Sequence, residues 1–187
     1  RLIIYISLVL INHLKGIIID SFGNLHEHSE DNDRVVLLPT MYGGEYGPDL
    51  EFISEQASMN KEDVITIHSS IDYLVYMIGF TPGFPYLGGL DERLAAPRLK
   101  TPRITIPSGT VGIAENQTGV YPTESPGGWR LIGRTPLDLF NPHRDPPSLI
   151  SAGDYIRFVP LTDEAQFSEI LSLVKLGNYE VSIESSR

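Results

Sequence analysis

The hydrophobic and polar positions divide the chain into three stretches. Residues 1–20 are almost wholly apolar, but the continuous run LIIYISLVLI at 2–11 is about half as long as a helix that spans a bilayer, so we expect a buried element there. No small-x-small cleavage site follows this run, which argues against a secretion signal. Residues 21–33 are polar and acidic and indicate a linker before a main domain at 34–187.

The first part of the main domain combines one apolar run with two helical patterns. The run VVLL at 35–38 predicts a short buried strand, and residues 49–57 are expected to form a helix. A second helix is predicted over 61–68, because Asn60 is a suitable N-cap residue. Asp63 would then place a carboxylate near the positive end of the helix dipole.

Proline and glycine concentrate between residues 79 and 147, which hold 11 of the 14 prolines and 10 of the 17 glycines. Both residue types break helices, so long helices are excluded there. Short apolar pieces between the breakers predict strands, with a spacing typical of barrels and sandwiches, at 103–106, 110–114, 119–121 and 129–132. The main domain is therefore expected to be mainly β.

The C-terminal part returns to regular patterns. Alternation predicts a strand at 155–159 and another at 179–184. Between them a helix is predicted that ends at Gly177 and whose apolar face carries Phe167, Ile170, Leu171 and Val174.

The composition narrows the range of partners. The 14 Lys and Arg residues against 24 Asp and Glu residues give a formal net charge of −10, so long-range repulsion disfavours nucleic acid. Cysteine is absent, which excludes disulfides within the sequence and is compatible with a reducing compartment. Together with the short apolar run, this predicts a cytoplasmic protein with no membrane partner.

Several familiar catalytic patterns have no match. There is no GxxxxGK[ST] phosphate loop and no Met-Lys-Met biotin site. The HEH tripeptide at 26–28 has no third ligand at a recognised spacing, so a solvated loop is favoured over a metal site. Ser108 lacks the flanking glycine of a nucleophile elbow. We therefore predict no metal site and a chain that is not a complete enzyme by itself.

Two aromatic segments point to a binding groove. In GFTPGFPYLGGL at 79–90, Pro82 and Pro85 restrict the backbone, so that Phe80, Phe84 and Tyr86 are presented at low entropic cost. The alternative is a hydrophobic plug that closes one end of a barrel. The second segment, GVYPTESPGGWRLIGRTP at 119–136, repeats this combination of rings, prolines and glycines, which favours two loops that face one another.

The second segment also adds polar groups. Tyr121 and Trp129 would wall the groove, and Arg130 or Arg134 at its edge would suit a small carboxylate, an amide or a protein segment. The alternative is that each arginine pairs with an acidic residue. Gln117 and Thr118 add an amide and a hydroxyl, as ligand contacts or as turn chemistry.

His68 is the one histidine in an apolar context, and this makes it a secondary candidate. A hydrogen-bonded core histidine is favoured over a proton shuttle.

In order and spacing, the motifs GFTPGFPYLGGL, TPRITIPSGTVGIAENQTGVYP and SPGGWRLIGRTPLDLFNP resemble the PxpB/KipI family, also called allophanate hydrolase subunit 1. The motifs HSSIDYLVYMIGF and MYGGEYGPDL match the family too, and the resemblance covers about residues 35–160. The resemblance implies a C-terminal cyclophilin-like β-barrel at 34–187, preceded by a small α/β domain. Residues 1–33 would be an incomplete remnant of that small domain with its linker, because the family's usual opening strand with a Gly-Asp element has no counterpart here.

The family resemblance implies three kinds of function. The leading hypothesis is a subunit of an ATP-dependent 5-oxoprolinase, which opens 5-oxoproline to glutamate with a KipA/PxpC-type subunit and a LamB/YcsF-like PxpA subunit. In that case ATP is used by the assembled complex, and no cofactor is bound by this chain alone. The alternatives are a KipI-like inhibitor of a sporulation histidine kinase and the matching half of a urea carboxylase carboxyltransferase. The cyclophilin-like shape of the barrel also suggests prolyl isomerase activity as a further function. A fold alone, however, does not determine a function.

Overall fold

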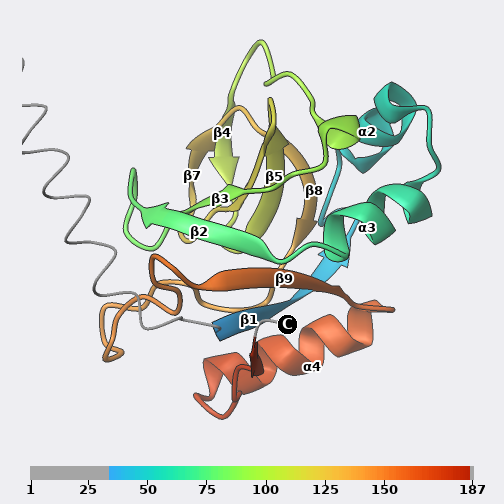
Figure 1. The fold of residues 1–187 in the computed structure, drawn as a ribbon. Coiled ribbons are helices and arrows are strands. Elements are labelled where there is room, and N and C mark those ends of the chain that lie inside the picture. The colour runs from blue at the N-terminus through green and yellow to red at the C-terminus, as the bar shows by residue number, and fades with distance from the viewer. Residues whose placement is uncertain (1–33, 186–187) are drawn as a thin grey trace, which may run out of the picture. The chain divides into compact units, whose positions relative to one another are not determined.

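The computed structural model describes residues 34–185 (Figure 1). The expectations for residues 1–33, a buried apolar element followed by a linker, lie outside the described residues. Within residues 34–185, no helix is both long and apolar enough to cross a membrane.

Eight strands form one curled sheet in the order β3-β2-β9-β1-β8-β5-β6, with β10 added beside β1. A separate pair, β4 (Arg103–Ile106) and β7 (Ser125–Gly127), lies outside this sheet. The strands of the large sheet are β1 (Arg34–Tyr42), β2 (Tyr73–Ile78), β3 (Pro85–Gly88), β5 (Thr110–Ala114), β6 (Gln117–Val120), β8 (Arg130–Arg134), β9 (Tyr155–Pro160) and β10 (Ile183–Ser185).

The sheet is nearly a closed barrel. Its two end strands, β3 and β6, lie next to each other although no ladder of hydrogen bonds joins them. The prediction of a mainly β, barrel-like main domain is confirmed. The seam between β3 and β6 is where backbone pairing stops, so side chains alone close the barrel there.

Strand β1 is longer than the predicted 35–38, because Pro39 does not interrupt it. The backbone N–H of Leu37 donates to Ser182 on the β10 side, and the nitrogen of residue 39 faces the same way. The β10 pairing ends at Val36 and the β8 pairing begins at Met41. The N–H that proline lacks would therefore point into the gap between these two strands.

The helices follow the predictions closely. They are α2 (Leu50–Ala57), α3 (Lys61–Ser69) and α4 (Glu164–Lys175), with a short 3-10 turn at Glu92–Leu94. The Asn60 side chain accepts a hydrogen bond from the Asp63 N–H at 2.7 Å, which confirms the predicted cap of α3. Figure 1 shows α2 and α3 side by side, and α4 against β1.

The apolar face of α4 is also confirmed. Phe167 is buried, and the other three residues of that face are half-buried. Gly177 follows the helix with a φ of 72°, the left-handed conformation that stops a helix and that glycine adopts without a steric penalty.

Other strand predictions needed correction. The strands β2 and β3 were not predicted; for β3 the reason is that the prolines and glycines of 79–90 indicate a loop. Pro85 nevertheless begins β3 at the end of the sheet, where a missing N–H is tolerated. The predicted strand 179–184 was wrong in extent: the strand is Ile183–Ser185, which pairs with Arg34–Val36 of β1, and a single further hydrogen bond joins Leu37 to Ser182.

The core lies inside the barrel and under the helices, and strand β5 is buried on both faces. Its Val111 and Ile113 belong to the main core, whereas Ala114 belongs to a second apolar cluster. That second cluster contains Phe84, Ile106, Ala114, Tyr121, Trp129 and Leu131. Because alternate side chains of a strand point to opposite faces, β5 separates the two clusters.

His68 is fully buried in the main domain. Its Nε2 lies 2.8 Å from the Thr118 hydroxyl and its Nδ1 lies 2.8 Å from the Tyr42 hydroxyl. The Thr118 hydroxyl donates its proton to the Gly112 carbonyl at 3.1 Å, so it accepts from an Nε2–H group, and Nδ1 then accepts from Tyr42. This arrangement holds a neutral imidazole, and burial lowers the pKa of His68 from 6.5 to about 3.

Asp49 joins helix α2 to the sheet. Its Oδ2 accepts a hydrogen bond from the Leu131 N–H at 2.7 Å, and its own N–H donates to the Leu131 carbonyl at 2.8 Å. Its Oδ1 lies 3.0 Å from Nη2 of Arg103 and 3.8 Å from Nη1 of Arg130. The carboxylate is therefore the shared partner of a buried amide and two arginines, which explains why it does not cap α2.

We expect replacement of His68 to remove a pH dependence of stability. The unfolded chain binds a proton near pH 6.5, but the native imidazole does not until about pH 3, so native stability falls as the pH drops below 6.5. Between pH 7.5 and 5.0 the free energy of unfolding should fall by about 2 kcal/mol from this group. Urea unfolding of the wild type and His68→Gln at both pH values measures it.

The variant His143→Gln is the control, because His143 is exposed. It should lose stability on acidification as the wild type does, whereas His68→Gln should lose about 2 kcal/mol less. Equal losses in all three proteins would contradict the buried, neutral state of His68.

Removal of the Asp49 carboxylate should be strongly destabilising. Asp49→Ala leaves a buried Leu131 N–H and two guanidinium groups without their shared partner, for which we expect a loss of about 3 kcal/mol. Glu51→Ala removes an ion pair to Lys61 that is exposed to solvent, and should change stability by less than about 0.5 kcal/mol. Urea unfolding at pH 7.5 compares them, and similar losses would refute the role assigned to Asp49.

Candidate functional site

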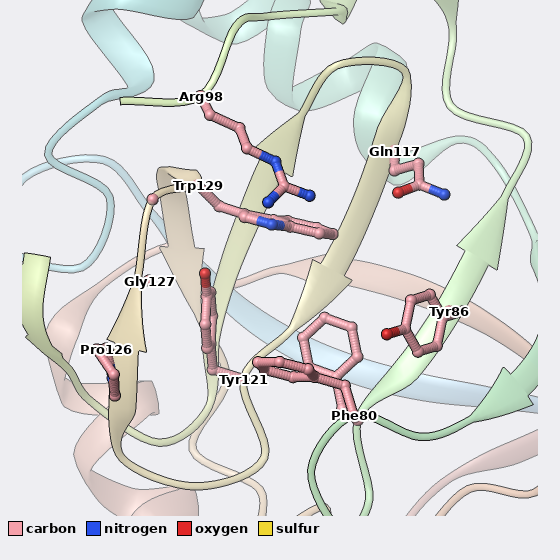
Figure 2. A pocket seen from close by; sticks show the side chains of 10 residues that line it. Phe80, Tyr86, Arg98, Gln117, Tyr121, Pro126, Gly127 and Trp129 are labelled. Carbon is pink, nitrogen blue, oxygen red and sulfur yellow. The ribbon is translucent and has the colours of Figure 1, made fainter. Parts of the chain in front are cut away.

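A pocket of about 210 Å³ opens next to the seam between β3 and β6 (Figure 2). Its walls come from segments that are far apart in the sequence, and most are aromatic or glycine-rich. The lining residues are Phe80, Phe84, Tyr86, Arg98, Gln117, Tyr121, Pro126, Gly127, Gly128 and Trp129.

Phe84 is the centre of the aromatic wall. Its ring makes edge-to-face contacts with Tyr86, Trp129 and Tyr121, at centroid distances of 5.3, 5.8 and 6.0 Å. Such contacts are favourable beyond the area that they bury. Because Phe84, Tyr121 and Trp129 are each less than a tenth exposed, the pocket has a floor that is part of the second apolar cluster.

Glycines allow these rings to lie close to the backbone. A Cβ at Gly127 would lie 2.3 Å from the Tyr121 hydroxyl oxygen, and a Cβ at Gly119 would lie 3.0 Å from the Trp129 ring. A larger residue at either position would displace a ring of the wall.

Phe80 stands out from the rest of the wall. It is 80% exposed and lies 6.1 Å from the Phe84 ring. Its φ of 66° puts a bulky residue in the left-handed region, which costs about 1–2 kcal/mol. Strain of this kind is concentrated at functional loops, and an exposed ring at the pocket entrance fits contact with a ligand or partner.

Arg98 supplies the cation of the pocket. Its guanidinium carbon lies 5.9 Å from the centroid of the Trp129 ring, in a cation–π arrangement. Figure 2 shows this guanidinium beside the indole, and the Tyr86 hydroxyl pointing toward the space between the rings.

The Tyr121 hydroxyl titrates above its ordinary range. Burial raises the pKa of Tyr121, and a backbone hydrogen bond from Trp129 and the charge of Arg98 lower this pKa by a smaller amount.

The structure brings together six of the residues that the sequence suggested for a groove. These are Phe80, Phe84, Tyr86, Gln117, Tyr121 and Trp129. The two aromatic segments therefore do face one another. The alternative of a plug also describes part of the arrangement, because the buried rings fill one side of the barrel while Phe80 and Tyr86 remain accessible.

The other suggested residues lie outside the lining of this pocket. Pro82 is exposed in the loop before β3, Thr118 is buried and bonded to His68, and His68 belongs to the core. The interpretation of His68 as a proton shuttle finds no support in this position, because both ring nitrogens are already hydrogen-bonded.

The two arginines that were expected at the groove edge also have other partners. The Arg130 guanidinium lies 3.6 Å from the Phe52 ring centroid, near Asp49, and its Nε donates to the Pro97 carbonyl at 3.2 Å. The Arg134 Nε donates to the Ser108 carbonyl at 2.9 Å. For Arg130, pairing with an acidic residue is thus the alternative that the structure favours.

Sequence reasoning missed Arg98. It lies in LAAPRLKTPR, which carries neither aromatic residues nor glycine, and only tertiary structure brings it to Trp129.

Within residues 34–185, no group of three or more His, Asp or Glu side chains is arranged to hold a metal ion. The walls of the pocket are mostly aromatic and include one cation, Arg98. The pocket is therefore suited to bind a small molecule with a flat apolar body and one polar or anionic group.

Comparison with known proteins gives the family. A model of the carboxyltransferase domain, subdomain C and D, matches residues 3–150. The chain is 51% identical over 145 residues to the B-type subunit of 5-oxoprolinase from Bacillus subtilis (strain 168), which covers 78% of this chain and 60% of the relative. It is 49% identical over 134 residues to the protein of the same name from Escherichia coli O157:H7, at 72% and 62% coverage. The chain thus spans about 60% of the length of these relatives.

Solved structures agree with this assignment. The conserved uncharacterized protein PH0987 from Pyrococcus horikoshii is 49% identical, with a TM-score of 0.69 over 83% of this chain and 69% of that chain. The Kluyveromyces lactis urea carboxylase shares the fold at 23% identity, with a TM-score of 0.68 over 82% of this chain and 16% of that chain. The chain therefore belongs to the family of the carboxyltransferase domain, subdomain C and D, and to its branch related to the B-type 5-oxoprolinase subunits.

Proposed function

We propose that the chain is part of the B-type subunit of a heteromeric, ATP-dependent 5-oxoprolinase, which converts 5-oxoproline to glutamate. The observation that carries this proposal is the identity of 51%, 49% and 48% to proteins named as this 5-oxoprolinase subunit in three different bacteria. The relatives named urea carboxylase and urea amidolyase are only 26% and 27% identical, so the urea-type function has weaker support.

The pocket is compatible with such a substrate. 5-Oxoproline is a small five-membered lactam with one carboxylate, so it has a compact ring and two polar ends. A pocket of about 210 Å³ with aromatic walls can cover the ring, while Gln117 and Tyr86 offer an amide and a hydroxyl to its polar atoms. In this proposal the chain binds and orients the lactam.

The chemistry of lactam opening explains why further subunits are needed. Resonance makes the lactam carbonyl unreactive toward water. Transfer of the terminal phosphoryl group of ATP to the carbonyl oxygen would activate it, and water could then add to the carbon. Cleavage of the C–N bond, with a proton to nitrogen, would then give γ-glutamyl phosphate. A second water would hydrolyse this acyl phosphate to glutamate and inorganic phosphate, and ADP is the other product. We assign the nucleotide-dependent step to the partners, a KipA/PxpC-type subunit and a LamB/YcsF-like PxpA subunit, acting together in the cytoplasm.

A second candidate is a KipI-like inhibitor of a histidine kinase. The observation in its favour is Phe80, whose ring is 80% exposed at the entrance of an aromatic pocket that could also receive a protein segment. Autophosphorylation of histidine kinases from the same cell, measured with and without the full-length protein, tests it. Unchanged phosphorylation of every kinase would reject this function.

The enzyme proposal predicts that glutamate forms only in the complete mixture. The measurement is glutamate release from 5-oxoproline and ATP by the full-length protein with its partner subunits, against a mixture that omits only this protein. Activity that persists after the omission would rule out an obligatory role.

The same assay tests the pocket. Gln117→Ala and Tyr86→Phe each remove one polar group from the wall, and we expect kcat/KM to fall about 3- to 10-fold for each. Leu176→Ala is the control, because Leu176 is exposed after the end of α4 and outside the pocket lining. It should retain wild-type turnover, and full activity of both pocket variants would place the substrate elsewhere.

A further inference from the structure

Arg98 differs from the other arginines between residues 34 and 185. Each of the others donates hydrogen bonds to a carboxylate or a carbonyl oxygen; they are Arg34, Arg93, Arg103, Arg130, Arg134, Arg144 and Arg157. Arg98 alone among them has no hydrogen bond or ion pair within the described residues, and its recorded contact is with the Trp129 ring. The side chain is exposed, and no carboxylate of the described residues competes for its N–H donors.

The position of Arg98 gives this observation a functional meaning. The side chain lies at the pocket and its guanidinium is 5.9 Å from the Trp129 ring centroid. Contact with the ring face restrains the guanidinium without using any of its N–H donors. In the view of Figure 2 it lies over one side of the indole, with Phe80 and Tyr121 on the other side of that ring and with Gln117 and Tyr86 beyond its edge. The donors are therefore positioned for a ligand.

We propose that Arg98 is the residue that recognises a carboxylate group of a small, flat organic acid bound in this pocket. The ligand's apolar body would lie against the Phe84 and Tyr86 rings. Its carboxylate would accept two parallel N–H bonds from the guanidinium. The proposal deepens the proposed function, on which it rests for the identity of the acid as 5-oxoproline.

A carboxylate fits better than a phosphate group for two reasons. The planar fork of one guanidinium matches the two oxygens of a carboxylate. A phosphate would carry more charge and more acceptor oxygens, yet Arg98 is the one cationic side chain among the residues that line the pocket. The aromatic remainder of the wall suits the apolar part of an organic acid.

The test compares an acid with its neutral analogue. The full-length protein is titrated by calorimetry with 5-oxoproline and with 5-oxoproline carboxamide, which has the same ring but no charge. Trp129 lines the pocket, so a fluorescence change that is lost in Trp129→Phe reports binding there. We expect Arg98→Ala to weaken binding of the acid about 10- to 100-fold and to leave binding of the carboxamide unchanged.

Two further variants sharpen the test. Arg98→Lys keeps the charge but loses the fork, so it should recover only part of the affinity for the acid. Lys100→Ala removes the same charge from an exposed residue outside the pocket lining, and should bind the acid as the wild type does. Cooperative urea unfolding of each variant shows that it is folded.

Four results would overturn the inference: no binding of either compound, unchanged affinity of Arg98→Ala for the acid, equal losses for acid and carboxamide, or an equal loss in Lys100→Ala. Turnover by the assembled complex distinguishes a failure of the inference about Arg98 from a failure of the proposed 5-oxoprolinase function. If the complex forms glutamate with an unchanged KM in Arg98→Ala, only the inference fails. If the complex is inactive but the chain binds the acid through Arg98, only the proposed function fails.

Discussion

The rest of the structure depends on one buried carboxylate, that of Asp49. It accepts the Leu131 N–H of β8, pairs with Arg103 and lies near Arg130. Arg103 in turn donates to the Trp129 carbonyl at 3.3 Å. The backbone on both sides of residue 130 is thus held by a single acidic side chain and its arginine partner. Because Trp129 forms a wall of the pocket, the same interaction that joins α2 to the sheet also positions the candidate site.

The pocket is located where the barrel is least complete. Backbone hydrogen bonds connect the sheet from β3 around to β6 but do not cross the seam between them, and aromatic side chains take over there. A seam closed by side chains can leave room between them, whereas a continuous ladder cannot. This explains how a small domain with a well-packed core can also keep an accessible aromatic cavity at its surface.

Much of this was predictable from the sequence, and the failures have physical causes. Helix α3 was predictable because its cap is local, and the two aromatic segments because their rings and glycines are close in sequence. The strand β3 was missed, since Pro85 is tolerated only at a sheet end, which a sequence does not reveal. Arg98 was missed for a similar reason: its contact with Trp129 exists only in the folded chain, while Arg130, beside Trp129 in sequence, points to Asp49 and Phe52.

Strand β5 has a consequence for how such a protein can diversify. Its side chains support the main core on one face and the aromatic cluster on the other, so every exchange in this strand disturbs one of two packed layers. A change of ligand preference by substitution in β5 would therefore come with a loss of stability. New specificities are more accessible through the surface loops that carry Phe80 and Arg98, where side chains are exposed and substitutions are tolerated.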